Sequence, residues 1–349
     1  MPVVNDPIET REVFAQAREL GVALPAFCAE DERGQEAVLA GTLDKALEIA
    51  VDDLPVIIAC TINYPPRSQM QLYTHSGDPK LGLHAFFSHL DTLTSPHSPY
   101  RRLRVLPCLD HGFPWLDEYA LDDYADRFAT VMFDASERPF DENIALTAEY
   151  VEKMKGRVVI EGCVDEIAES GAAAGSEITT VENAERFLAE TGVDLIVANL
   201  GTEHRATAAE KRYHSTRAKE ISDAVGTILV LHGTSCLKEE DLPKLAADGI
   251  IKVNIFTILA QLGGQAVARH VLENLGNMFT AKQLRELADA GFLGDRYFTK
   301  AYADEHCQGA LGPKLAHVAE PPRRDAWVAP VRKQVKHYTD VFGYGKFAP

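Results

Sequence analysis

Three histidines and an aspartate stand at or just after the ends of apolar runs in this sequence. We expect these runs to form the core, so the polar residues lie at its edge. Asp110 and His111 end RVLPCLDHG, His204 follows DLIVANLG, and His232 ends GTILVLHG. Three neutral imidazoles with an open fourth position are a common catalytic zinc arrangement, so these residues predict a site for Zn²⁺ or another divalent metal. Asp110 either orients the His111 ring or faces the substrate as a proton donor or acceptor, and the spacing leaves both roles open.

The elements that must position these residues are eight short apolar runs. They are LPAFCAE (24–30), DLPVIIACTI (53–62), RVLPCLDHG (104–112), ATVMFDAS (129–136), RVVIEGCV (157–164), DLIVANLG (194–201), GTILVLHG (226–233) and IIKVNIFT (250–257). Such runs are typical of parallel strands that are buried on both faces. Their alternation with helical patterns over residues 24–275 predicts an α/β fold, a (β/α)8 TIM barrel, with an open doubly wound sheet as the alternative.

The placement of polar residues favours the barrel over the open sheet. Side chains suited to chemistry occur near the carboxyl end of every predicted strand. A barrel gathers these ends around one mouth, whereas an open sheet spreads them along a line, because neighbouring strands are about 4.8 Å apart. After residue 275 the alternation stops. We expect residues 277–349 to form a C-terminal helical extension of one single domain that spans residues 1–349.

Composition and charge narrow the possible functions. The formal net charge of −17 disfavours a nucleic-acid partner, so we expect a small-molecule substrate. No apolar stretch approaches the roughly 20 residues of a membrane span, and the first residues lack the pattern of a signal peptide. The six cysteines occur singly, without a C-x-x-C pair, which is typical of reduced chains. These features predict a cytoplasmic location.

Two further polar residues, Asp134 and Ser136, end the fourth run in FDAS. Short polar side chains after a strand commonly cap a turn, and at a barrel mouth the same residues can bind substrate. The spacing alone leaves these two interpretations equal.

The strand-end motifs LDHG, MFDAS, VIEG, NLGTEH, LHGTS and KVNIFT, in this order, resemble the class II, zinc-dependent fructose-bisphosphate aldolase family. The likeness covers residues 24–275, and the segment from PPRRDAWV onward resembles the last helix of that family. The resemblance implies a lyase that makes or breaks a carbon–carbon bond of a ketose, sugar phosphate or related sugar acid through a zinc-stabilised enediolate. We also expect a homo-oligomer, either a dimer or a tetramer.

By this resemblance the zinc ligands are His111, His204 and His232. Asp110 is the catalytic acid/base, and Glu161 matches an acidic residue of the fifth strand, which we group with the metal site. The substrate-binding candidates are residues at the remaining strand ends: Thr61, Asp134, Ser136, Arg205, Gly233, Ser235, Asn254 and Thr257.

The sequence departs from the family at positions that shape the substrate pocket. Cys28 replaces the asparagine that follows the first-strand phenylalanine, and Phe256 and Ile258 replace the aspartates of an Asn-x-Asp-Thr-Asp run. The metal-binding histidines are spared. These changes therefore predict the same enolising chemistry on a different substrate.

The base for the carbon-bound proton is expected on the loop after the fifth strand. That loop reads DEIAESGAAAGSE and lacks the family's glycine-glycine-acid pattern, and we assign the base to Glu169, with Glu166 and Glu177 as alternatives. Two other mechanisms remain open. A metal-dependent sugar or sugar-phosphate epimerase or isomerase would reuse the enediolate on the same scaffold. A Schiff-base aldolase would use Lys252 as its nucleophile.

Overall fold

The computed structural model describes residues 2–65, 68–167, 178–202 and 213–349. It contains eight strands, one in each predicted run: β1 (Leu24–Cys28), β2 (Leu54–Cys60), β3 (Leu103–Gly112), β4 (Thr130–Phe133), β5 (Val159–Cys163), β6 (Leu195–Val197), β7 (Leu229–Leu231) and β8 (Ile250–Ile255). Nearly all strand residues are buried, as expected for strands that are covered on both faces.

The strands form a closed parallel barrel in sequence order. Each strand pairs with the next along the chain, and β1 also pairs with β8, where Ala26 lies opposite Asn254. The predicted TIM barrel is therefore confirmed, and the open sheet is excluded. Because all eight strands run in the same direction, their carboxyl ends meet at one rim.

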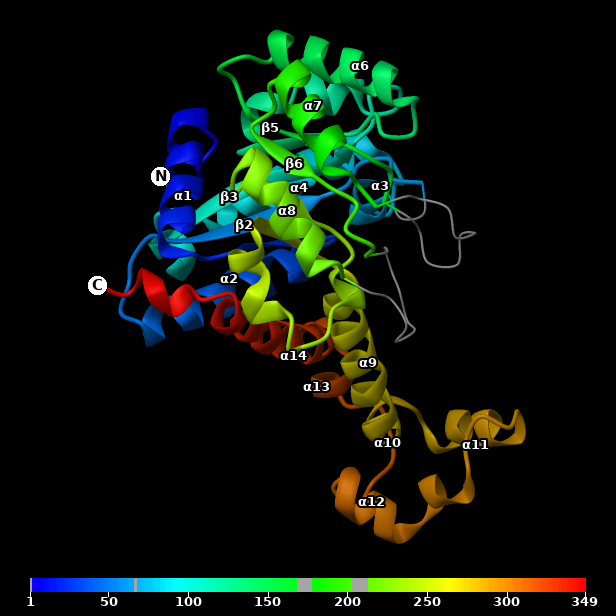
Figure 1. Cartoon of the computed structure of the whole chain (residues 1–349). Coiled ribbons are helices and arrows are strands. Elements are labelled where there is room, and N and C mark those ends of the chain that lie inside the picture. The colour runs from blue at the N-terminus through cyan, green and yellow to red at the C-terminus, as the bar shows by residue number, and fades with distance from the viewer. Residues whose placement is uncertain (1, 66–67, 168–177, 203–212) are drawn as a thin grey trace. The chain divides into compact units, whose positions relative to one another are not determined.

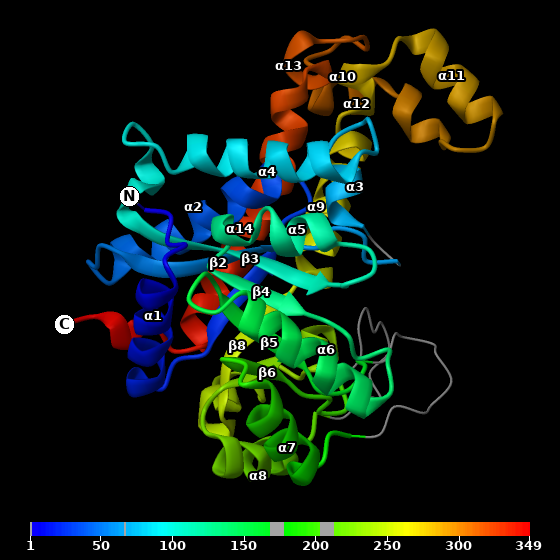
Figure 2. The same ribbon diagram turned by 90° about the horizontal axis from the view of Figure 1, so that it is seen from above.

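Helices surround the barrel (Figure 1). They are α1 (Pro7–Leu20), α2 (Glu32–Glu48), α3 (Gln69–Tyr73), α4 (Pro79–Leu93), α5 (Glu118–Asp122), α6 (Phe140–Lys153), α7 (Val181–Thr191) and α8 (Ser215–Val225). Short 3₁₀ turns accompany them: η1 (Pro99–Arg102), η2 (Ala125–Arg127), η3 (Thr234–Cys236), η4 (Leu242–Asp248) and η6 (Tyr344–Phe347). Figure 2 shows α2 and α4 on the side of β2 and β3, and α7 and α8 on the side of β6.

The helix starts follow from local sequence. Asp6 precedes Pro7 at the start of α1, and its side chain accepts hydrogen bonds from two backbone amides of the first turn. Asp78 does the same before Pro79 at the start of α4. An acidic cap satisfies amides that have no partner within the helix, and proline at the first helical position needs no donor. The apolar spacing of residues 8–20 and 81–93 predicts a helix in each segment, and α1 and α4 confirm both.

Two segments differ from the pattern that the sequence suggests. Residues 115–127 read as one acidic helix but form only α5 and η2. The Asp117 carboxylate accepts hydrogen bonds from the Phe113 amide and from Asn63, so it holds a loop before α5 begins. Residues 294–321 read as irregular but contain α12 (Lys300–His306), which Thr299 caps, and α13 (Leu315–Val318).

The chain divides into two compact units. The first comprises residues 1–258 and 332–349 and contains the barrel. The carboxyl-terminal residues belong to it, since Arg332 pairs with Asp44 of α2 at 2.6 Å and Tyr344 donates to the Pro55 carbonyl of β2 at 3.0 Å.

The second unit comprises residues 259–331. Its elements are most of α9 (Thr257–Glu273), α10 (Leu275–Met278), α11 (Ala281–Asp289), η5 (Asp295–Phe298), α12, α13 and the first part of α14 (Glu320–Val341). It has a small core of its own around Leu275, Leu284 and Tyr297. That both units fold as one domain stays a prediction.

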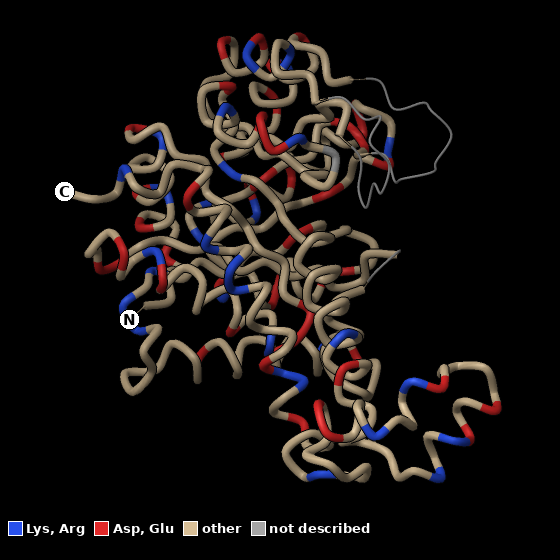
Figure 3. The backbone as a smooth tube through the Cα atoms, turned by 90° about the horizontal axis from the view of Figure 1, so that it is seen from below, with Lys and Arg blue, Asp and Glu red and all other residues tan. Residues whose placement is uncertain are grey.

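Charged residues occur throughout the chain, with acidic positions spread over many elements and basic positions between them (Figure 3). None of the helices in the part that the structure describes is long and apolar enough to cross a membrane.

Candidate active site

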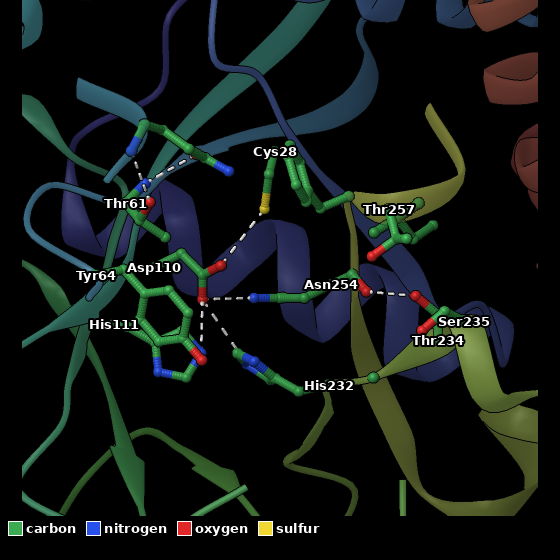
Figure 4. A pocket seen from close by; sticks show the side chains of 14 residues that line it. Cys28, Thr61, Tyr64, Asp110, His111, His232, Thr234, Ser235, Asn254 and Thr257 are labelled. Atoms are coloured by element: carbon green, nitrogen blue, oxygen red, sulfur yellow. Dashed lines mark hydrogen bonds and ion pairs between the residues drawn. The ribbon is translucent and has the colours of Figure 1, made fainter. Parts of the chain in front are cut away.

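The end of β3 brings two consecutive polar side chains into one cavity. In a regular strand Asp110 and His111 would point to opposite faces. His111 has a φ of 48°, in the left-handed region, and the pairing with β4 shifts register between Leu109 and Gly112. Both side chains therefore line the same cavity at the barrel mouth (Figure 4). A non-glycine residue in this region costs on the order of 1–3 kcal/mol and is typical of functional sites.

Glycine follows at position 112 for a steric reason. A Cβ atom there would lie 2.7 Å from Leu121 Cδ2 and 3.1 Å from the Met132 carbonyl oxygen. Both contacts are tight, so a larger residue would require the Leu121 side chain or the neighbouring backbone to shift.

Asp134 fixes the His111 ring. Its Oδ2 lies 2.7 Å from His111 Nδ1, and its Oδ1 accepts hydrogen bonds from the amide and the hydroxyl of Ser136. Burial alone would raise the pKa of Asp134, but the bonds from His111 and Ser136 lower it, so the group is a carboxylate. A carboxylate only accepts, hence Nδ1 carries the proton and Nε2 keeps a lone pair for the cavity.

His232 follows β7 and points into the same cavity. Its Nε2 lies 3.9 Å from Asp110 Oδ1, and His111 Nε2 lies 3.8 Å from the same oxygen. The two imidazole planes are 81° apart, and the three ligand atoms all lie within 4.8 Å of one another. Two imidazole nitrogens and a carboxylate oxygen suit zinc or a similar divalent ion. His111 and His232 thus offer two imidazole nitrogens that fit a metal, with the Asp110 carboxylate beside them.

Two side chains donate hydrogen bonds to the Asp110 carboxylate. Asn254 Nδ2 of β8 donates to Oδ1 at 2.8 Å, and Cys28 Sγ of β1 donates to Oδ2 at 3.4 Å (Figure 4). Burial, followed by the charge of Asp110, raises the pKa of the Cys28 thiol, which keeps the proton on sulfur. The carboxylate is therefore held from two neighbouring strands.

Most predicted substrate-binding residues surround these groups. Those that line the cavity with Asp110, His111 and His232 are Thr61, Gly233, Ser235, Asn254 and Thr257. Asp134 and Ser136 line an adjoining cavity with Phe113, Glu137 and Glu166. The FDAS motif was open to two interpretations, a turn cap or a substrate-binding group. The structure shows the turn cap, in which Ser136 donates to Asp134, and it also shows that Asp134 contacts His111.

Sequence reasoning missed three lining residues with polar side chains: Tyr64, Gln69 and Thr234. The centroids of the Tyr64 and His111 rings lie 4.7 Å apart. The Thr61 amide donates a hydrogen bond to Gln69 Oε1 at 3.0 Å. Thr234 donates to the Asn254 carbonyl at 2.8 Å, which joins the ends of β7 and β8. Only Thr234 carried a signal, because it stands inside the LHGTS motif.

The sequence groups Glu161 with the metal site, but the Glu161 side chain contacts Lys252 instead. Its Oε2 pairs with Lys252 Nζ at 2.8 Å in the barrel interior, where both side chains are fully buried. The candidate metal group among the described residues does not include it. Burial alone would lower the pKa of Lys252, but Cys108, Glu161 and Asp110 outweigh it and raise the pKa. Lys252 is fully buried against Glu161 and does not line the cavity, so this pair argues against a Schiff-base role for Lys252.

Three predicted site residues, Glu169, His204 and Arg205, lie outside the described residues. Thr202, two positions before His204, donates its hydroxyl proton to the His232 carbonyl at 2.7 Å. The last described residue before His204 is therefore joined to the histidine that follows β7.

A parallel eight-stranded barrel with imidazole and carboxylate groups converging at its carboxyl rim defines a TIM-barrel protein with a candidate metal site. The sequence model of the family described as fructose-bisphosphate aldolase class-II matches residues 8–311. The chain belongs to this family, as its strand-end motifs suggested. Members of the family generally depend on a divalent metal.

Several curated relatives are named as aldolases. The 6-phospho-5-dehydro-2-deoxy-D-gluconate aldolase of Shouchella clausii is 36% identical over 133 residues, which are 37% of this chain and 45% of the relative. The D-tagatose-1,6-bisphosphate aldolase subunit GatY of Klebsiella oxytoca is 33% identical over 153 residues, or 42% of this chain and 53% of the relative. The match thus spans about half the length of these relatives.

Solved structures share the fold over nearly the whole chain. The fructose-bisphosphate aldolase of Campylobacter jejuni superposes with a TM-score of 0.70 at 19% identity, covering 97% of this chain and 95% of that one. The YdjI aldolase of Escherichia coli K12 gives a TM-score of 0.60 at 22% identity, with coverages of 97% and 98%.

Proposed function

We propose that this protein is a metal-dependent aldolase that makes or breaks a carbon–carbon bond of a ketose, sugar phosphate or related sugar acid. One observation carries the proposal. His111 Nε2 and His232 Nε2 converge on the Asp110 carboxylate inside a cavity at the barrel mouth, with His111 held in the metal-binding tautomer by Asp134. Aldol chemistry needs a Lewis acid beside a proton-transfer group, and this arrangement supplies both.

The metal ligands in this proposal are His111, His232 and, from the family resemblance, His204. The ion is zinc or another divalent metal, and when bound it supplies positive charge that stabilises the negative charge developing on the substrate. Asp134 keeps the His111 Nε2 lone pair directed at the ligand position. The Thr202 bond to the His232 carbonyl supports His204 as the third ligand, because it joins the strand ends that precede the two histidines.

Asp110 transfers the hydroxyl proton that moves when the carbon–carbon bond is cleaved or formed. In cleavage it takes the proton from the hydroxyl on the carbon that becomes the aldehyde, and in condensation it returns that proton. The buried carboxylate is fixed by Asn254 and Cys28, so it is oriented before the substrate arrives. The base for the carbon-bound proton is assigned to Glu169 of the loop after β5.

The substrate carries an anionic group, with phosphate favoured over carboxylate. The two relatives above are named for phosphorylated substrates. In this chain Gly233 to Ser235 and Asn254 to Thr257 line the cavity after β7 and β8, where TIM barrels commonly bind phosphate through backbone amides. Arg205 would add a cation. Asn254 Oδ1 is buried without a hydrogen-bond partner among the described residues, so it is suited to accept a substrate hydroxyl.

The reaction products test the proposal. The metal-loaded protein is incubated with a panel of ketoses, ketose phosphates and sugar acid phosphates, and the products are separated by chromatography. An aldolase releases an aldehyde fragment and a shorter ketone or keto acid. An epimerase or isomerase, the alternative on the same scaffold, returns a stereoisomer of unchanged carbon number. Release of fragments supports the aldolase, and stereoisomers without fragments would replace it.

The remaining expectations concern the protein in the cell. We propose a cytoplasmic homo-oligomer, a dimer or tetramer. Light scattering coupled to gel filtration measures the mass of the assembly, and a monomer of 38.3 kDa would contradict the oligomer.

A further inference from the structure

The Asp110 carboxylate has one fixed donor on each oxygen. Asn254 holds Oδ1 from β8, and Cys28 holds Oδ2 from β1. These strands pair directly, with Phe27 opposite Ile255. A carboxylate held at one oxygen only can still rotate about its Cβ–Cγ bond. The second donor removes that freedom.

Cys28 is well placed for this contact. Its sulfur lies 3.4 Å from Oδ2, and Cys28 and Asp110 are only 6% and 5% exposed. In such a buried setting a hydrogen bond to a charged acceptor is stronger than the same bond in water. Cys28 also lines the cavity, so its contact lies at the site and not behind it.

We propose that Cys28 is a positioning residue that sets the orientation of the Asp110 carboxylate by donating its S–H proton to Oδ2. The inference rests on the proposed function, in which Asp110 transfers the substrate proton. Cys28 does not exchange a proton with the substrate. Its effect reaches the reaction only through the rotation of Asp110.

The neighbouring thiol of Cys60 provides a matched control. Cys60 ends β2, beside β1, and is also buried, but it is not among the residues that line the cavity. Loss of the Cys60 sulfur creates a similar small void in the same part of the barrel. It leaves both donors to Asp110 in place.

The first test separates positioning from packing by kinetics. Misplacement of a catalytic group by about 1 Å can cost about 10²-fold, so we expect Cys28→Ala to lower kcat by about 10-fold while KM and bound metal stay unchanged. Cys28→Ser restores a donor and most of kcat, and Cys60→Ala retains full activity. In an Asp110→Asn background Cys28→Ala causes no additional loss. Equal losses in Cys28→Ala and Cys60→Ala, or a full additional loss in that background, would overturn the proposal.

The second test needs no turnover. The S–H stretching band of Cys28 is identified in the infrared difference spectrum of the protein and its Cys28→Ser variant. A donor to a carboxylate absorbs at lower wavenumber than a thiol that donates to no group, and Asp110→Ala should shift the band upward. An unshifted band would end the proposal even in an active enzyme. A shifted band in a protein that cleaves no sugar would instead sustain the contact and refute the proposed function.

Discussion

His111 Nδ1 and Asp134 Oδ2 lie 2.7 Å apart, and this contact determines which nitrogen of the ring faces the cavity. Asp134 directly follows β4, which pairs with the strand that carries His111, and it is itself held by Ser136 through two hydrogen bonds. The histidine and its orienting carboxylate thus come from two different sequence motifs, LDHG and MFDAS. The geometry of the metal site depends on their pairing across β3 and β4.

Asp134→Asn should weaken metal binding without unfolding the protein. An amide can donate to Nδ1 as well as accept from it, so the ring no longer keeps its Nε2 lone pair toward the cavity. Loss of such orienting partners typically lowers metal affinity by about 10- to 100-fold. Competition with a chromogenic chelator measures the effect. Asp91→Asn, which removes a surface carboxylate that pairs with Arg127, is the control and should bind metal normally.

Asp110→Asn should retain the fold and lose bond cleavage. The amide keeps the size of the side chain but cannot accept the hydroxyl proton, and general acid–base catalysis contributes about 10²- to 10⁴-fold. Steady-state cleavage of the substrate found in the panel gives the loss in kcat, and circular dichroism checks the fold. Turnover within a factor of a few of the original rate would show that another group moves the proton.

Lys252→Met should destabilise the barrel. The substitution leaves the Glu161 carboxylate buried without its ammonium partner, and removing one member of a buried pair costs about 3–5 kcal/mol. Urea unfolding measures the change. Lys155→Met removes an exposed pair with Glu152 and should change stability little. Replacing Lys252 and Glu161 together by apolar residues should recover stability. A double variant as unstable as the single one would mean that packing, not charge, is responsible.

The fold could be predicted because buried parallel strands leave a clear pattern. In RVLPCLDHG the residues from Val105 to Leu109 are apolar and the polar Asp110 and His111 follow them, and that contrast marks both the strand and the rim. Short elements were less predictable. Five-residue α5 depends on the contacts of Asp117 with Phe113 and Asn63, and these partners are not visible in local sequence.

The positions of the site residues could be predicted from the sequence, but the contacts that their side chains make were less predictable. Strand ends identified Asp110, His111 and His232, which the structure brings together. Sequence could not tell that Glu161 points into the barrel toward Lys252, because side-chain direction within a closed barrel depends on strand tilt and register. It also could not assign Asp134, whose partner His111 is 23 positions away in the chain.

Inorganic phosphate should inhibit the enzyme competitively. The residues after β7 and β8 supply backbone amides for an anion, and Phe256 and Ile258 stand where the family has carboxylates, which lowers the local negative charge. Inhibition is measured by varying phosphate and substrate together. Arg205→Ala should weaken it, whereas Arg127→Ala on the surface should not. Activity that is unchanged in millimolar phosphate would indicate a neutral substrate and no anion site.

The metal content of histidine variants tests the central claim most directly. The purified protein should carry one divalent ion per chain, and the single variants His111→Ala, His204→Ala and His232→Ala should each lose most of it, because a site with three protein ligands is weakened when any of them is removed. His84→Ala alters an exposed residue of α4 and should keep the full amount. Elemental analysis after gel filtration gives the stoichiometry. Full occupancy in all three cavity variants would contradict the account.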